Sequence, residues 1–413
     1  MLQKLASQPS SNQSHLDWWQ REDLCYHNGE LVFAGHPVKL LAERYGTPSF
    51  VYSLDRAKNN LTRLHEALNE SGFGGRYRIL YAMKANRFAP LLTGLKLSGL
   101  CGIDACSPEE VEHAIACGFS PSEISFTAGS LTQKEYEILA KYEDLGMNCD
   151  SIHAIRSWGN LRPGTKMGIR INPAVGVSRE GNERLQYAGR AISKFGIYQE
   201  QFDEALDLAN KFNLKVTDIH FHTGCGYLTS QLEQWSNVME RCLWFLDKCE
   251  HLNRVNVGGG LGVPHQAEDG ILDLVAWGRV LAKYFGNRDI KLDIEPGEYI
   301  MKDAGLLLLQ KTFLERKSDT LFLGVDAGFN IAPEPAWYDL RFLPLPLIAP
   351  QGSINPVTVV GNINEALDVW YKDALLPDMT EQPFLALLNG GAYSSSMASN
   401  HCMRGKLKEY LLI

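Results

Sequence analysis

The feature that most constrains this chain is an alternation of short apolar runs with amphipathic segments, repeated between Ile79 and Gly297. Each apolar run has the length of a buried strand, and a pattern with helical spacing follows it. These units predict an α/β fold, a (β/α)8 TIM-like barrel, with an open doubly wound sheet as the alternative. The eight runs end at Lys84, Ser107, Gly129, Ser151, Pro173, Gly224, Gly260 and Gly297.

Two of the helical patterns are explicit enough to place. In "SPEEVEHAIACGF", Ser107 can cap the helix and Glu110 can complete a capping box, so we expect Glu110 to be a helix cap rather than a catalytic acid. In "QFDEALDLANKF", Leu206, Ala209 and Phe212 fall on one face.

The sequence changes character after Gly297. Strand-like runs are joined there by turns rich in proline and glycine, without intervening helices, which indicates a second, mostly β domain. Segments before the barrel are also β-like and are expected to join that domain. The predicted division is a polar N-terminal extension (1–24), an N-terminal part of the β domain (25–49), the barrel (50–298) and a C-terminal β domain (299–413).

Composition narrows the class of function. A net charge of -8 without long charged blocks argues against nucleic acid or an anionic membrane as a partner. Nine cysteines without a C-x-x-C pair are typical of a reducing compartment rather than of a disulfide framework. No apolar run approaches membrane-spanning length, and the start of the chain lacks the apolar core of a signal peptide. We therefore expect a cytoplasmic protein that handles small molecules.

Polar residues recur at the carboxyl ends of the predicted strands, where a barrel of this kind carries its catalytic groups. A lysine amine can form a Schiff base, a carboxylate can keep a pyridine nitrogen protonated, and backbone N–H groups can hold a phosphate. This combination predicts a site for pyridoxal 5'-phosphate. The residues concerned are Lys84, Asp104, Thr127, Asp150, Arg170, His220, His222, Gly258 to Gly260, Glu295 and Gly297.

Two other kinds of site are less compatible with these residues. His220, His222 and Cys225 are close enough in sequence to mimic a metal cluster, but no further ligand pair has zinc spacing, so we expect no metal. The run "GGGLGVP" does not fit G-x-G-x-x-G, and Pro264 follows soon after it, which argues against a dinucleotide loop.

The order of motifs resembles a known family. "YAMKAN", "DACSPEEVEHA", "IRINP", "SKFGI", "HFHTG", "GGGLG", "EPGE", "DAGFN" and "GAYSSSM" are similar to the fold-type III pyridoxal-phosphate decarboxylases, in particular the diaminopimelate and ornithine decarboxylase group. The resemblance covers about residues 25 to 413. It implies a barrel that holds the cofactor and a C-terminal β domain that supplies residues across a homodimer interface. The "GNINEALD" and "GAY" segments are expected to complete a shared pocket.

The resemblance also implies roles for individual residues. Lys84 would carry the cofactor, His222 would stack on its ring and Glu295 would pair with the pyridinium nitrogen, while Asn364 stands at the position of the catalytic proton donor. The remaining cofactor-binding positions would be Asp104, Arg170, Gly224, Cys225, Gly258, Gly259, Gly260, Gly297 and Tyr393. The substrate-binding positions would be Glu298, Glu334, Tyr338, Glu365 and Tyr393.

The chain departs from the family pattern at several of these positions. Cys225 replaces a serine, and in "GNINEALD" Asn364 replaces a cysteine that is thought to deliver a proton from the partner subunit. Asparagine is not a general acid at neutral pH. Glu298 and Glu334 stand where the family has arginines.

The leading hypothesis is therefore a lyase that decarboxylates an amino acid or an amino-acid conjugate through a quinonoid intermediate. A racemase or epimerase on the same fold, and a non-catalytic regulatory paralogue that binds the cofactor, are the alternatives. If Glu298 and Glu334 both point inward, they repel a distal carboxylate, so free meso-diaminopimelate is predicted not to be the substrate. The opposing interpretation is that the glutamates face solvent or pair with Arg341.

Overall fold

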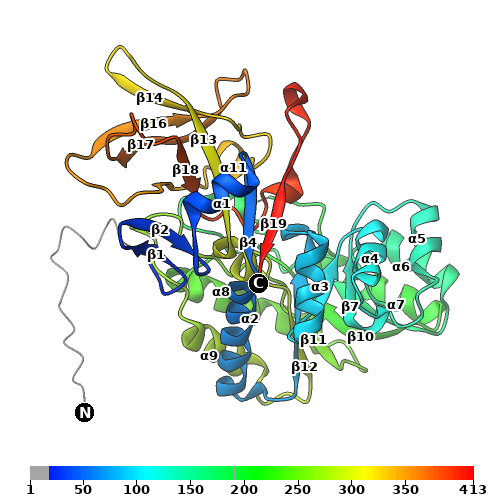
Figure 1. The fold of residues 1–413 in the computed structure, drawn as a ribbon. Helices are drawn as coiled ribbons and strands as arrows, with labels where there is room; N and C mark the ends of the chain where they lie inside the picture. The colour runs from blue at the N-terminus through cyan, green and yellow to red at the C-terminus, as the bar shows by residue number, and fades with distance from the viewer. Residues whose placement is uncertain (1–17, 190) are drawn as a thin grey trace.

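A closed barrel of eight parallel strands forms the centre of the structure, a computed structural model that describes residues 18–189 and 191–413 (Figure 1). Each predicted apolar run supplies one strand, so the predicted barrel is confirmed and the open sheet is wrong. In order around the barrel the strands are β10 (Lys215–His220), β11 (Arg254–Asn256), β12 (Lys291–Ile294), β5 (Tyr77–Ala82), β6 (Gly102–Ala105), β7 (Ile124–Thr127), β8 (Gly146–Cys149) and β9 (Lys166–Arg170).

Helices connect consecutive barrel strands. Ser107 caps α4 as predicted, because its Oγ accepts a hydrogen bond of 3.1 Å from the backbone N–H of Glu110. The reciprocal half of the capping box is wrong: the Glu110 carboxylate accepts from the N–H of Cys106, at 2.7 Å, one residue before the cap. The principal helices are α2 (Leu54–Leu68), α3 (Ala89–Ser98), α4 (Pro108–Ala116), α5 (Gln133–Leu139), α6 (Ile152–Leu161), α7 (Phe202–Lys211), α8 (Leu232–Leu246) and α9 (Leu274–Phe285).

A second sheet lies beside the barrel, at the top of Figure 1. Its strands run in the order β15 (Pro344–Pro346), β18 (Phe384–Leu387), β13 (Gly305–Lys317), β14 (Thr320–Val325), β16 (Asn355–Val360) and β17 (Val369–Leu376). β4 (Ser49–Ser53) pairs with both β13 and β19 (Glu409–Leu412), so segments from the two ends of the chain share this sheet. β4 falls within the range that the sequence assigned to the barrel.

The segment before β4 forms a small unit of its own. It contains β1 (Leu24–His27), β2 (Glu30–Phe33), β3 (His36–Pro37) and the helix α1 (Val38–Tyr45), which the β-like sequence pattern did not predict. Trp19 and Leu24 are buried here in an apolar cluster with residues of β13. Residues 1–17 of the predicted polar extension lie outside the described residues.

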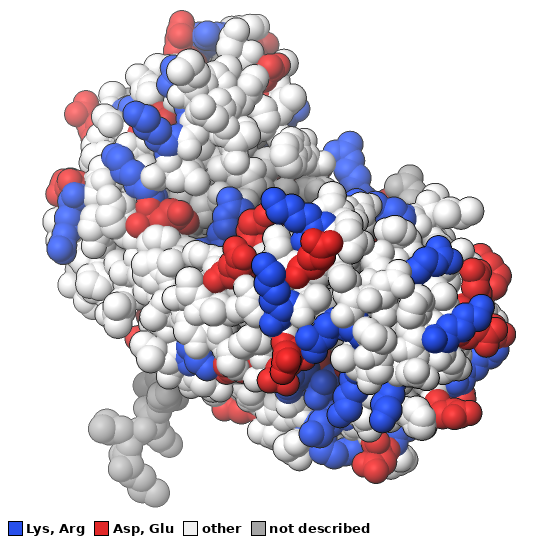
Figure 2. All heavy atoms as spheres, turned by 90° about the vertical axis from the view of Figure 1, so that its right-hand side faces the viewer, with Lys and Arg blue, Asp and Glu red and all other residues white. Residues whose placement is uncertain are grey.

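The face drawn in Figure 2 shows neither a basic nor an acidic block among the described residues. In Figure 2, lysine and arginine side chains are interspersed with aspartate and glutamate over the face that is drawn. Within residues 18–189 and 191–413, no helix combines the length and the apolar character needed to cross a membrane.

Candidate active site

A cavity of ≈ 450 Å³ opens at the carboxyl ends of the barrel strands. The barrel contributes Lys84, Cys106, Thr127, Arg170, His222 and Cys225 to its lining, and the segments that follow the barrel contribute Glu298, Glu334, Tyr338, Leu340, Tyr393 and Met397. Some of the predicted strand-end residues and most of the predicted substrate-side residues therefore meet around one space. The predicted cofactor residues Asp104, Glu295 and Gly258 to Gly260 are not among its lining residues.

Lys84 stands in this cavity because the chain turns sharply after β5. The short 3-10 helix η2 (Met83–Ala85) follows the strand, and the Lys84 side chain is accessible from the cavity while its neighbours Met83 and Ala85 are buried. The N–H of Tyr393 donates to the carbonyl of Ala85, at 2.8 Å, which anchors the C-terminal segment beside the lysine. The electrostatic influence of Cys106, and then of Asp104, raises the pKa of Lys84 well above its usual value against the effect of burial.

Glu295 is held rigidly at the end of β12. Asn256 Nδ2 donates to its Oε1 at 2.6 Å, and His220 Nε2 lies 3.1 Å from its Oε2. Burial raises the pKa of Glu295 to about 7 and lowers that of His220 well below its usual value, so His220 is a neutral imidazole. Asn256 also accepts from the N–H of Gly258, at 2.9 Å, and thereby links the carboxylate to the glycine run. Asn256 had not been predicted as a site residue, because the seventh apolar run was expected to continue to Gly260 whereas β11 ends at Asn256.

The glycine run has a backbone that other residues would not adopt easily. Gly258 and Gly260 have φ angles of 69° and 93°, and a Cβ on Gly258 would lie 2.6 Å from the carbonyl oxygen of Phe221. The N–H of Gly259 donates to His222 Nδ1 at 3.2 Å. A backbone turn without side chains beside a cavity suits the close approach of a phosphate.

His222 and Cys225 form a contact on the cavity wall. Cys225 Sγ lies 3.5 Å from His222 Nε2, and the ring of Tyr187 is centred 5.3 Å from the imidazole. Burial lowers the pKa of His222 well below its usual value and raises that of Cys225 to about 11, so both groups are neutral. Among the described residues no three histidine, cysteine or acidic side chains are placed to hold a metal ion.

Other predicted cofactor residues lie at or behind the cavity wall. The guanidinium of the buried Arg170 is centred 4.6 Å from the ring of Phe195, and both residues line the cavity. Asp104 is buried on β6, where burial and then Glu295 raise its pKa well above the usual range. Gly297 needs to be glycine because a Cβ there would lie 2.7 Å from Tyr393 Oη. Cys106 lines the cavity although it had not been predicted as a site residue; its position directly after β6 was the available signal.

Glu298 lines the cavity at the start of α10 (Glu298–Met301) and is 7% exposed. Its Oε1 accepts from the N–H of Val263 at 3.2 Å and lies 3.6 Å from both Arg179 Nη2 and His265 Nε2. Although burial acts in the opposite direction, His265 and Arg179 hold the pKa of Glu298 below its usual value. Glu298 is therefore a carboxylate with the Arg179 guanidinium behind it.

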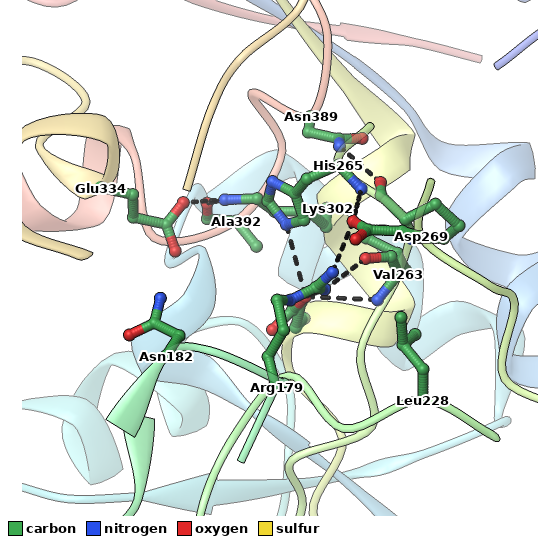
Figure 3. A network of polar contacts seen from close by, with 12 residues as sticks. Arg179, Asn182, Leu228, Val263, His265, Asp269, Lys302, Glu334, Asn389 and Ala392 are labelled. Atoms are coloured by element: carbon green, nitrogen blue, oxygen red, sulfur yellow. Dashed lines mark hydrogen bonds and ion pairs between the residues drawn. The ribbon is translucent and has the colours of Figure 1, made fainter. Parts of the chain in front are cut away.

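Glu334 lines the same cavity from α11 (Glu334–Tyr338) and contacts a buried lysine (Figure 3). This lysine, Lys302, begins the short 3-10 helix η7 (Lys302–Ala304) and is fully buried. Its Nζ contacts the Glu334 carboxylate and donates to the carbonyl of Ala392 at 3.0 Å. Pairing of the glutamates with Arg341 or exposure to solvent, the two interpretations left open by the sequence, are both wrong.

The loop 361–368 does not reach the cavity of its own chain. Asn364 and Glu365 are exposed and are not among the residues that line the Lys84 cavity. Asp368 holds the base of the loop by accepting from the N–H groups of Ile363, at 2.6 Å, and Phe329, at 2.8 Å. Tyr393 behaves differently: it lines the cavity together with Lys84 of the same chain, so it needs no partner subunit to reach the site.

Fold and site together define a class of enzyme. The mouth of the barrel holds a lysine and a histidine on one cavity, with a glycine turn hydrogen-bonded to that histidine and a buried carboxylate linked to the turn through Asn256. This set of groups suits pyridoxal phosphate. Residues 56–302 match the family model described as "Pyridoxal-dependent decarboxylase, pyridoxal binding domain", and the chain belongs to this family. It is thus a pyridoxal-phosphate-dependent carboxy-lyase that acts on amino acids.

Several relatives in this family are diaminopimelate decarboxylases. The enzyme from Methanothermobacter thermautotrophicus is 31% identical over 401 residues, covering 93% of this chain and 91% of its own. The structure of the Helicobacter pylori enzyme complexed with L-lysine has a TM-score of 0.80 at 26% identity, covering 91% of this chain and 94% of that one. The structure of the M. jannaschii enzyme, also with L-lysine, has a TM-score of 0.85 at 25% identity, covering 95% and 93%.

Proposed function

We propose that the chain removes the α-carboxylate of a diamino acid, and that free meso-diaminopimelate is among its substrates. The supporting observation is that Glu298 and Glu334 line the Lys84 cavity, whereas Lys302 is not among the lining residues. The cavity wall therefore exposes carboxylates to the substrate, while the basic residue that pairs with Glu334 lies outside the cavity lining. A side-chain ammonium is the group that such a wall binds best.

The cofactor-side residues have separate tasks. Pyridoxal phosphate, when bound, accepts the electron pair that remains on the α-carbon after carbon dioxide leaves. Lys84 holds the cofactor, and the turn at Gly258–Gly260 receives its phosphate. Glu295 would pair with the pyridine nitrogen, because Asn256 and His220 fix the positions of both of its oxygens. The reaction is completed when the α-carbon takes up one proton.

The charge argument against free meso-diaminopimelate does not hold in this environment. It assumed two unpaired glutamates facing a distal carboxylate. Each glutamate instead pairs with a buried basic side chain, Arg179 for Glu298 and Lys302 for Glu334, and burial lowers the pKa of Lys302 to about 7. The distal end of meso-diaminopimelate carries an ammonium as well as a carboxylate. The glutamates can attract this ammonium, while the positive charge of Arg179 offsets their repulsion of the carboxylate. The names of the relatives support the same substrate.

The proposal includes a homodimer with shared active sites. The tip of loop 361–368 is exposed, including Asn364, Glu365 and Leu367. The base of the loop is firmly hydrogen-bonded through Asp368. A rigid loop with an exposed tip suits insertion into the cavity of a second copy of the chain.

The test is release of carbon dioxide from meso-diaminopimelate, L-lysine, L-ornithine and L-norleucine. Norleucine has the carbon chain of lysine without its second amine and is therefore the matched control. We expect the diamino acids to exceed norleucine in kcat/KM by about 10-fold to 100-fold, the scale of a charge-assisted hydrogen bond. Equal turnover of lysine and norleucine would refute recognition of the second amine, and no release from any compound would refute the decarboxylation.

A further inference from the structure

A second cavity, of ≈ 760 Å³, adjoins the Lys84 cavity; we call it the outer chamber. The two cavities share Tyr338 and Leu340 as lining residues. Glu298 lines the Lys84 cavity, whereas Arg179 and His265, each 3.6 Å from its carboxylate, line the outer chamber. The two cavities therefore meet at Tyr338 and Leu340, and a group bound at Glu298 has the outer chamber as its neighbour.

The outer chamber is large enough for a ligand group of its own. Its volume exceeds the ≈ 450 Å³ of the Lys84 cavity, and both fall within the range of about 300–1,000 Å³ that is usual for small-molecule sites. The reacting amino acid belongs in the Lys84 cavity because the α-carbon has to meet the cofactor there. The outer chamber is then available for the part of the substrate that extends beyond its second amine.

The inner end of the outer chamber is polar and buried (Figure 3). Asp269 Oδ2 accepts from Arg179 Nη1 at 2.6 Å and from the N–H of His265 at 2.7 Å, which fixes the position of both residues. Arg179 is 8% and His265 4% exposed. Yet, in the part of the chain that the structure describes, Arg179 Nε and His265 Nε2 have no hydrogen-bond partner. Buried polar atoms of this kind are normally satisfied, which points to a polar ligand or to water.

The rim of the outer chamber offers a cation for a carboxylate. Arg341 lines the chamber and is exposed, and within the described residues its guanidinium forms no ion pair and rests 5.7 Å from the centre of the Tyr371 ring. The neighbouring Arg184 is already engaged, since its Nη1 donates to the carbonyl of Trp337 at 2.7 Å. Glu180 and Asp339 are exposed at the same rim, so the chamber is not a general anion site.

We propose that the outer chamber binds a carboxylate-bearing extension of the substrate, with Arg341 as the partner of that carboxylate. The substrates would then be diamino acids that carry a carboxylate beyond the second amine, with free meso-diaminopimelate as the shortest and derivatives lengthened at its distal carboxyl as the better fit. This inference rests on the proposed decarboxylation of a diamino acid. It adds the outer chamber and Arg341 to the determinants of specificity.

The test compares two lengthened probes that differ only in one charge. Glycine or glycinamide is joined through its amine to the distal carboxyl of meso-diaminopimelate, which moves the end of the molecule outward by about 3.6 Å. Binding is measured by titration calorimetry with the cofactor-loaded Lys84→Ala protein, so that turnover does not consume the probe. The same titrations are made after adding Arg341→Ala, Ala336→Trp or, as a matched control, Arg316→Ala, which removes an exposed arginine of the β13 hairpin.

We expect the glycine probe to bind about tenfold or more tightly than the glycinamide probe, the scale of a hydrogen bond between charged groups. Arg341→Ala should make the affinities for the glycine and glycinamide probes equal, whereas Arg316→Ala should preserve the difference between them. Ala336→Trp should weaken the binding of both lengthened probes relative to that of meso-diaminopimelate. Equal affinity of the two probes before Arg341 is changed would overturn the proposal. A ratio that Arg341→Ala leaves unaltered would overturn it as well. Release of carbon dioxide from the shorter substrates decides the proposed function separately.

Discussion

The cofactor side and the substrate side of the Lys84 cavity are built in different ways. Lys84, His222, Glu295 and the Gly258–Gly260 turn all follow barrel strands, and backbone topology alone brings them together. Glu298 and Glu334 are placed instead by ion pairs with residues distant in sequence, notably Arg179 and Lys302.

This difference explains which half of the site tolerates change. A strand end can hardly be moved without disturbing the barrel, so the residues that hold the cofactor are fixed by the fold. A charge on the opposite wall can be reversed if a residue behind it is reversed as well. Glu298 with Arg179, and Glu334 with Lys302, have this arrangement.

The largest effect is expected at Lys84. Borohydride reduction of the holoenzyme followed by peptide mapping should find the cofactor attached to Lys84, and Lys84→Ala should reduce kcat by at least about 10³-fold. Attachment to any other lysine would show that the cofactor side has been placed wrongly.

Glu295→Gln is expected to have the next largest effect. The amide retains the shape but removes the charge that Asn256 and His220 hold in place, so kcat should fall by roughly 10²- to 10³-fold while the cofactor stays bound. Cofactor absorbance measures whether the cofactor stays bound, and steady-state rates measure kcat. An unchanged kcat would mean that Glu295 has no electrostatic role.

The third largest effect is expected for loop 361–368, which the proposed homodimer would insert into the partner's cavity. Lys84→Ala chains mixed with Glu365→Ala chains should regain activity, up to roughly a quarter of the wild-type level if subunits pair at random, because one of the two sites in a hybrid dimer is intact. A mixture of Lys84→Ala with Tyr393→Ala serves as the control and should stay inactive, since both residues line the cavity of one chain. Hybrid dimers of the first kind without activity would contradict the shared site.

A smaller effect concerns the stability of the cofactor-free protein. Burial raises the pKa of Glu295 from 4.5 to about 7, so the folded state keeps a proton that the unfolded state loses. This contribution is fully present below pH 4.5 and is lost as the pH rises to about 7, by roughly 3 kcal/mol in total. Urea titrations across this range should show the loss, and Glu295→Gln should reduce it. An identical pH profile in the variant would rule out Glu295 as its source.

The sequence predicted the parts of the site that depend on local pattern. Strand ends are legible because apolar runs mark them, and therefore Lys84, His222 and Glu295 could be placed before the structure was known. The pairing of Lys302 with Glu334 could not, because a fully buried lysine in the sequence "IMKDAG" looks like any surface lysine. The helix α1, by contrast, could have been predicted, because its sequence "VKLLAERY" is rich in strong helix formers.

The most direct test of the account is the ratio of kcat/KM for L-lysine to that for L-norleucine, measured in the wild type and in Glu298→Gln. If the carboxylates of the wall bind the second amine, the ratio should be about 10 to 100 in the wild type and should fall about tenfold in the variant. Glu315→Gln, which removes an exposed charge on β13, should leave it unchanged. A ratio that is large in the wild type and unaltered in Glu298→Gln would contradict the claim that this wall selects the substrate.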